Sequence, residues 1–297
     1  MKIDTKDLFI ILPISFLLMT GIIMVSSSSI YIADDMTNNP FHFAQRQALF
    51  IAIGLLALIF FLLLPSEFLF RTDWIFMLIS IFLLAILFVP DVGTSVNGSI
   101  RWIRLGPINI QPSEVCKFSL ILYISGYSVR RMTEINSLRS FLKPLFLLFL
   151  ISILIMGQPD LGSTAIVCIL VVGILFYAGI SFMQLCLLIL LIALLGYLAI
   201  TTSPMRIARI LAFTDPFAAD VVLNAGWQLS NSLISIGQGG WFGVGLGNSF
   251  QKSFYLPEAH TDFIFAILVE ELGLIGGLTL IFLFVLLFVG LVLISFD

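Results

Sequence analysis

Blocks of apolar residues, each long enough to cross a lipid bilayer, dominate this chain. Of its 297 residues, 60% are hydrophobic and 10% are charged, whereas a soluble domain carries about a quarter charged residues. A spanning helix needs about 20 consecutive apolar residues. The sequence therefore predicts an all-α polytopic membrane protein. The net charge of −3 comes with no basic stripe, which argues against nucleic-acid binding.

Eight segments meet the length requirement and make residues 1–297 one predicted membrane domain. They cover residues 8–28, 44–64, 74–90, 113–128, 144–158, 162–179, 182–200 and 262–294. The last segment is too long for one straight crossing. Because Gly273, Gly276 and Gly277 interrupt it, we expect a bend there.

The distribution of Lys and Arg sets the predicted orientation, because cytoplasmic loops carry an excess of both. With the N-terminus in the cytoplasm, the inner segments contain Lys2, Lys6, Arg71, Arg130, Arg131, Arg139 and Lys143. Residues 90–112, 158–162 and 201–261 then lie outside. The 201–261 loop is rich in Gly and Trp, and long loops of this kind are often functional. We expect it to be tightly folded and partly embedded in the membrane.

A cluster of ionisable residues lies directly before the last apolar segment, within the predicted outer loop. Glu258, His260 and Asp262 fall within five positions of one another. Charges at a membrane boundary are costly to desolvate and are often functional. Asp262, with Thr261 as a candidate N-cap, suits a general base held in a fixed place. A role in capping the helix explains the same residue equally well.

Two further acids, Glu270 and Glu271, lie inside the last apolar segment. Because of the helical rotation between them and Asp262, they cannot share a site with it directly. Acids within a span must face protein or water. The sequence favours structural roles for both.

The predicted outer loop at 90–112 offers candidate anion-binding groups. Arg101 and Arg104 can clamp phosphate oxygens, because guanidinium groups suit bidentate contacts. Glu114 and Lys117 are spaced i,i+3 on the following helix, close enough to pair. That pair can simply satisfy itself, or Lys117 can belong to an anion site, which we favour.

The segment Gln158-Pro-Asp-Leu-Gly162 joins the fifth and sixth spans. Asp160 can cap the sixth span, or it can line the same cavity as Asp262. His42 and His260 are the only histidines, and they lack the spacing of a zinc site.

Six motifs, in order along most of the chain, resemble the SEDS (FtsW/RodA/SpoVE) family of bacterial cell-wall proteins. They are Val96-Asn-Gly-Ser-Ile-Arg-Trp-Ile103, Ile110-Gln-Pro-Ser-Glu114 with Lys117, Gln158-Pro-Asp-Leu-Gly162, Gly226-Trp-Gln-Leu229, Ile236-Gly-Gln-Gly-Gly-Trp241 and Leu256-Pro-Glu-Ala-His-Thr-Asp-Phe-Ile-Phe265. Trp227-Gln-Leu229 and Pro257-Glu-Ala-His260 are most similar to the FtsW branch, which acts in cell division.

The resemblance implies a peptidoglycan glycosyltransferase that polymerises lipid II at the outer face of the bacterial cytoplasmic membrane, at the division septum. It implies that Asp262 is the catalytic base. It places Arg101, Lys117 and Asp160 at an outward cavity, where Arg104, Glu114 and Gln158 are further candidates for substrate binding. Glu258, His260 and Thr261 would support the base. A class B penicillin-binding protein, other division proteins and a divalent cation (Mg or Mn) are the implied partners and cofactor.

Members of the family usually have ten spans, whereas eight are predicted here. We therefore expect a C-terminally incomplete SEDS fold. Two alternatives to the enzyme stay open: a lipid II flippase, which would need polar groups at several depths of the membrane, and a non-catalytic division scaffold.

Overall fold

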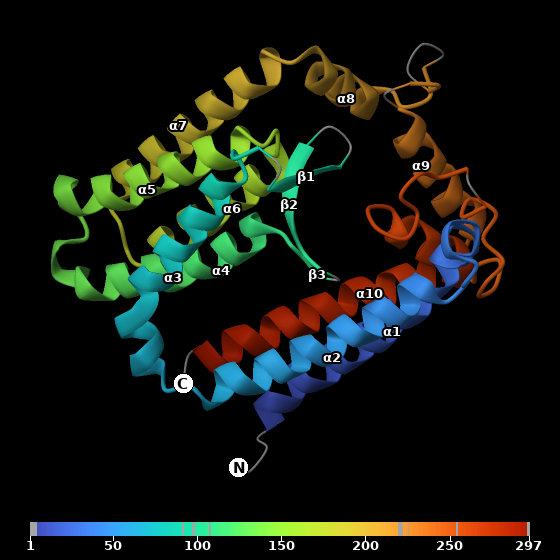
Figure 1. Cartoon of the computed structure of the whole chain (residues 1–297), viewed down its shortest axis with the longest axis horizontal. Coiled ribbons are helices and arrows are strands. Elements are labelled where there is room, and N and C mark those ends of the chain that lie inside the picture. The colour runs from blue at the N-terminus through green and yellow to red at the C-terminus, as the bar shows by residue number, and fades with distance from the viewer. Residues whose placement is uncertain are drawn as a thin grey trace. The chain divides into compact units, whose positions relative to one another are not determined.

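Long apolar helices form most of this protein (Figure 1). The computed structural model describes residues 5–90, 92–96, 99–106, 108–218, 222–224, 226–253 and 255–295. The long helices are α1 (Thr5–Thr37), α2 (His42–Leu63), α3 (Ser66–Ile86), α4 (Pro112–Arg130), α5 (Leu138–Met156), α6 (Leu161–Tyr177), α7 (Phe182–Thr201) and α10 (Ile264–Ser295). Each of the eight predicted spans falls on one of these helices, which confirms the predicted fold class.

Six of the helices in the described ranges are long and apolar enough to cross a membrane. The two others that match predicted spans are α6, a shorter apolar helix, and α4, which carries Glu114, Lys117 and Arg130. The count of eight spans is therefore approximate.

Three predicted boundaries are wrong by six residues or more. Helix α1 ends at Thr37 rather than at residue 28, α3 begins at Ser66 rather than at residue 74, and α5 begins at Leu138 rather than at residue 144. The first turns of α3 and α5 contain charged residues, which end an apolar run but do not interrupt the hydrogen bonds of a helix.

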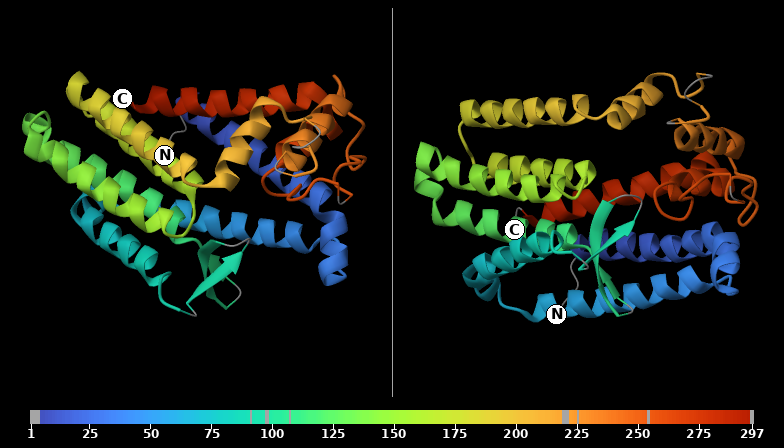
Figure 2. Two further views of the ribbon diagram at one scale, coloured as in Figure 1. Left: turned by 90° about the horizontal axis from the view of Figure 1, so that it is seen from above. Right: turned by 45° about the horizontal axis from the view of Figure 1, so that its top comes forward.

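The chain divides into two compact units, which are described separately: residues 1–60 with 203–297, and residues 61–202. In the 61–202 unit, α4 packs against α3 and α6, while α6 also packs against α5 and α7 (Figure 2). Buried apolar side chains fill the spaces between these helices, among them Met77, Leu84, Leu120, Ile151 and Val171.

A small antiparallel sheet connects α3 to α4, a feature that the sequence analysis did not predict. Its strands are β1 (Gly93–Val96), β2 (Ser99–Leu105) and β3 (Ile108–Ile110), in the order β1-β2-β3. Ile103 pairs with Gly93 on one side and with Ile110 on the other. Asn97 and Gly98 of the first family motif lie outside the described residues.

In the other unit, α10 packs against α1 and against α9 (Trp227–Gly239). Met24, Leu256, Ala259 and Ile267 are buried between these elements. The predicted outer loop at 201–261 contains α9 and another short helix, α8 (Pro204–Thr214).

Helix α10 bends where the sequence predicts it, at Gly273, whose backbone is not helical (φ 73°, ψ −177°). The bend removes two helical hydrogen bonds, and the loop at 240–245 bonds to the four backbone groups that are released. The bonds run from Leu274 N to Gly240 O (2.8 Å), Ile275 N to Trp241 O (3.3 Å), Val244 N to Glu270 O (2.9 Å) and Gly245 N to Glu271 O (3.0 Å). The bend and the Gly-rich loop are therefore one structure.

Glycine is required at this junction because two backbones touch there. A Cβ on Gly273 would collide with the Trp241 carbonyl and the Gly243 amide, and a Cβ on Gly243 would collide with the Glu271 carbonyl. Both glycines also have positive φ, which is unfavourable for other residues.

We predict that Gly273→Ala destabilises the protein by at least about 2 kcal/mol, because the methyl group adds a backbone collision to the cost of positive φ. Thermal unfolding in detergent measures the effect. Gly54→Ala is the matched control, since Gly54 is in α2 with open space around its Cβ position. Equal changes in melting temperature for the two variants would contradict the prediction.

Candidate functional site

A tight turn holds Asp262 just before α10. The amides of Thr261 and Phe263 both donate to the Glu258 carbonyl, each at 3.2 Å. The Thr261 hydroxyl donates to the Glu258 carboxylate at 2.7 Å. The prediction that Thr261 caps the helix is therefore wrong: α10 begins at Ile264, and Thr261 instead closes the turn.

The Asp262 carboxylate is exposed. Among the described residues of its own unit, no side chain forms an ion pair or hydrogen bond with it. Its backbone is nevertheless well fixed, because Leu256 and Ala259 of the same segment are buried. The result is an acceptor oxygen at a defined position near a helix N-terminus, which is what a general base requires.

His260 is half-buried next to Asp262. Its ring packs against Phe43 of α2 with centroids 4.8 Å apart, and its buried Nδ1 has no hydrogen-bond partner in the described part of the chain. Burial lowers the pKa of His260, and the nearby Glu258 carboxylate opposes part of that shift. A neutral imidazole that supports the turn fits these surroundings.

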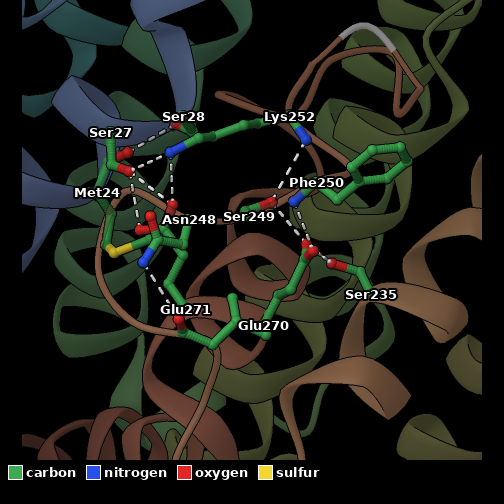
Figure 3. A network of polar contacts seen from close by, with 11 residues as sticks. Met24, Ser27, Ser28, Ser235, Asn248, Ser249, Phe250, Lys252, Glu270 and Glu271 are labelled. Atoms are coloured by element: carbon green, nitrogen blue, oxygen red, sulfur yellow. Dashed lines mark hydrogen bonds and ion pairs between the residues drawn. The ribbon is translucent and has the colours of Figure 1, made fainter.

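Two buried carboxylates on α10 hold the segments around the bend (Figure 3). Glu270 points toward α9 and the following loop. It accepts hydrogen bonds from the Ser235 hydroxyl (2.6 Å), the Ser249 hydroxyl (2.6 Å) and the Phe250 amide (2.8 Å). Three donors on one carboxylate compensate for its loss of water.

Glu271 points toward α1, on the other side of α10 (Figure 3). It accepts from the Ser27 hydroxyl at 2.7 Å and pairs with the Lys252 ammonium at 2.8 Å. The Lys252 and Glu271 side chains are 2% and 0% exposed, so the ion pair is fully buried. These contacts agree with the structural roles that the sequence favours for Glu270 and Glu271.

Lys252 is the main residue that the sequence analysis missed. It belongs to the predicted outer loop at 201–261, yet its side chain is buried and bonds to Glu271 of α10, 19 positions further along the chain. The sequence did contain one indication of a buried cation: Glu270 and Glu271 lie inside an apolar segment, and an acid inside a span requires a partner.

A second group of polar residues lies in the 61–202 unit, where the sheet meets α6. Arg101 donates to the Pro159 carbonyl at 2.9 Å, and its Nε lies 3.5 Å from the Asp160 carboxylate. Asp160 also accepts from the amide (3.1 Å) and hydroxyl (2.7 Å) of Ser163. This confirms that Asp160 caps the sixth predicted span. Gln158 is buried and donates to the Leu84 carbonyl at 3.2 Å, which ties the segment to α3.

The other predicted anion-binding residues are arranged differently. Arg101 and Arg104 are three positions apart on β2, and successive residues of a strand point to opposite faces, so the two lie on different faces. Arg104 is exposed, so the strand separates the two arginines that we expected to act together. Lys117 and Glu114 form the expected ion pair at 2.7 Å.

We predict that Lys252→Met or Glu271→Gln alone destabilises the protein by about 3–5 kcal/mol, because each leaves its buried partner uncompensated. The double variant recovers most of that loss, since neither charge is then left alone. Thermal unfolding in detergent of the wild type, both single variants and the double variant measures the coupling. Additive losses would contradict the prediction.

The comparison with known proteins gives one consistent result. Residues 7–297 match the FTSW_RODA_SPOVE family, described as "Cell cycle protein". The "Probable peptidoglycan glycosyltransferase FtsW" of Alkalilimnicola ehrlichii is 45% identical over 265 residues, which cover 89% of this chain and 66% of the relative. The protein of the same name from Legionella pneumophila is 43% identical over 283 residues, covering 95% and 71%. The chain thus spans about two thirds of the length of these relatives.

A solved structure shows the same fold. The study titled "Structural coordination of polymerization and crosslinking by a peptidoglycan synthase complex" contains a chain that is 25% identical to this one, with a TM-score of 0.67. The match covers 92% of this chain and 75% of the other. The sequence match over nearly the whole chain and the shared fold show that this chain belongs to the FtsW/RodA/SpoVE family of integral membrane proteins.

Proposed function

We propose that this chain is the greater part of a peptidoglycan glycosyltransferase that polymerises lipid II. The observation that carries the proposal is an exposed carboxylate, Asp262, on a turn that buried side chains anchor at the start of α10. The two FtsW relatives support the proposal, because both are named as probable peptidoglycan glycosyltransferases.

In the proposed reaction, Asp262 removes the proton from the 4-hydroxyl of the acceptor N-acetylglucosamine. That oxygen attacks C1 of the donor N-acetylmuramic acid and forms the new glycosidic bond with inversion. The bond from C1 to the phosphate oxygen breaks, and undecaprenyl pyrophosphate leaves with the electron pair. Assistance by a general base contributes roughly 10²- to 10⁴-fold to the rate of such a step.

The departing pyrophosphate carries negative charge, which cationic groups stabilise. Arg101, Arg104 and Lys117 are the candidates. Arg101 is already oriented by Asp160 and by the Pro159 carbonyl, so we propose it as the most fixed of the three. Lys117 would have to exchange its bond to the exposed Glu114 for a phosphate oxygen.

A divalent cation belongs to the proposal, but its ligands are not assigned. Within the described residues, no group of three His, Cys, Asp or Glu side chains is arranged to hold a metal ion. Asp262 alone supplies one carboxylate. The pyrophosphate of the substrate would have to supply the other oxygen ligands, as phosphates commonly do for magnesium.

Lipid II transport is the rival activity. A transport path requires polar groups that a substrate can reach at several depths. Three charged side chains are buried around the bend of α10: Glu270, Glu271 and Lys252. Their hydrogen bonds and ion pair are made to other groups of the protein. Their internal pairing favours a structural role over a transport path.

We propose that the protein works in the bacterial cytoplasmic membrane at the division septum, beside a class B penicillin-binding protein and other division proteins. The likeness to a chain from a peptidoglycan synthase complex supports such a partner. A scaffold without catalysis would use the same partner, so the activity itself must be tested.

We predict that Asp262→Asn lowers the rate of lipid II polymerisation by about 10²- to 10⁴-fold, because it removes the base and keeps the shape of the side chain. The assay uses labelled lipid II, the partner transpeptidase and the full-length protein, with glycan chains separated on a gel. Asp215→Asn is the control, since Asp215 is an exposed acid elsewhere in the same loop. Polymer made equally well by both variants would refute the role of Asp262, and lipid translocation without polymer would support the transporter.

A further inference from the structure

A hollow of about 700 Å³ lies in the 61–202 unit, and none of its lining residues takes part in the proposed reaction. It is formed where α3 begins, α4 ends and α5 begins, at the opposite end of α3 and α4 from the sheet. Aromatic side chains make up much of its wall: Phe70, Trp74, Tyr123 and Tyr127. A hollow of this size has room for more than a single inorganic anion.

Positive charge dominates the lining. Arg71, Arg130, Arg131 and Lys143 border the hollow, against one carboxylate, that of Asp73. The Asp73 side chain is buried and bonds to Arg130 at 2.7 Å. The lining itself therefore contains four cations and one carboxylate, an excess of positive charge.

Arg130 is held rigidly in this wall. Besides its bond to Asp73, it donates to the Phe70 carbonyl at 3.2 Å and lies over the Phe70 ring at 5.0 Å. Gly126 makes room for this arrangement, because a Cβ there would collide with the Asp73 carboxylate. A fixed guanidinium loses little entropy when it binds an anion.

The other cations can readily accept a new partner. Arg71 pairs with Glu67 at 3.8 Å, and Arg131 pairs with Glu134 at 2.7 Å, with all four side chains exposed. Exposed pairs of this kind contribute only about 0–1 kcal/mol. Lys143 forms no ion pair with any described residue and is exposed.

The position of the hollow identifies its environment. It lies at the end of the helices whose Lys and Arg residues the positive-inside rule assigns to the cytoplasm. Trp74 is exposed at this end, as expected for an aromatic residue at a membrane interface. Basic pockets between helices at the cytoplasmic surface are suited to acidic lipid headgroups.

We propose that this hollow binds an anionic phospholipid of the cytoplasmic leaflet. The exposed Arg131 and Lys143 side chains contact the phosphate of the lipid. Arg130, which Asp73 and the Phe70 carbonyl hold in place, contacts the same phosphate. The aromatic side chains pack against the glycerol and the upper acyl chains. A soluble phosphate would use the same cations, but it would leave the aromatic wall without an apolar partner.

Native mass spectrometry of the detergent-purified full-length protein tests this site, with dioleoyl phosphatidylglycerol and dioleoyl phosphatidylcholine as probes. We expect retention of phosphatidylglycerol over phosphatidylcholine. The expected loss of affinity is about fivefold for each charge removed in Arg131→Gln and Lys143→Gln. Arg131→Lys and Lys143→Arg, which keep the charge, should retain the lipid.

Arg139→Gln is the matched control, because Arg139 lies one turn before Lys143 on α5 and does not line the hollow. An equal loss in Arg139→Gln would show a general attraction to anionic lipid and overturn the site. Equal retention of phosphatidylcholine would also overturn it. Displacement of the lipid by inorganic phosphate at matched ionic strength would assign the site to a free anion instead.

Discussion

The bend of α10 at Gly273 is the constraint on which the rest of its unit depends. In an apolar environment each unpaired backbone group costs several kcal/mol, and the bend releases four of them. The loop at 240–245 supplies partners for all four. The loop cannot leave without exposing these groups, and α10 cannot bend in this way without the loop.

The buried carboxylates extend the same junction through side chains. The carbonyls of Glu270 and Glu271 accept bonds from the loop, while their carboxylates bind α9 and α1. Lys252, just before the Asp262 segment, is fixed by its ion pair with Glu271. The proposed base therefore lies on a short turn between two anchored elements, which is the rigid support that a catalytic group needs. Glu270, Glu271 and Lys252 thus support the position of Asp262, although none of them takes part in the proposed reaction.

The sequence predicts those features that depend on local pattern. Apolar length located the spans, three glycines located the bend, and i,i+3 spacing located the pair of Glu114 and Lys117. The small sheet was missed because its strands are short, with four, seven and three residues. Because β2 is a strand, its successive side chains point to opposite faces, and this separates Arg101 from Arg104. A loop would impose no such separation. The ion pair of Lys252 with Glu271 depends on how the segment before α10 folds back onto that helix. The spacing of the two residues in the sequence does not predict this fold.

The central claim is that the junction at the bend holds the segment that carries Asp262. Hydrogen–deuterium exchange, followed by mass spectrometry of peptides from residues 249–263, tests it in Glu271→Gln against the wild type. The account predicts faster exchange in these peptides and unchanged exchange in α4 and α6 of the other unit, because only the junction loses its ion pair. Unchanged exchange at residues 249–263 in a variant that has lost the Lys252 pair would contradict the account.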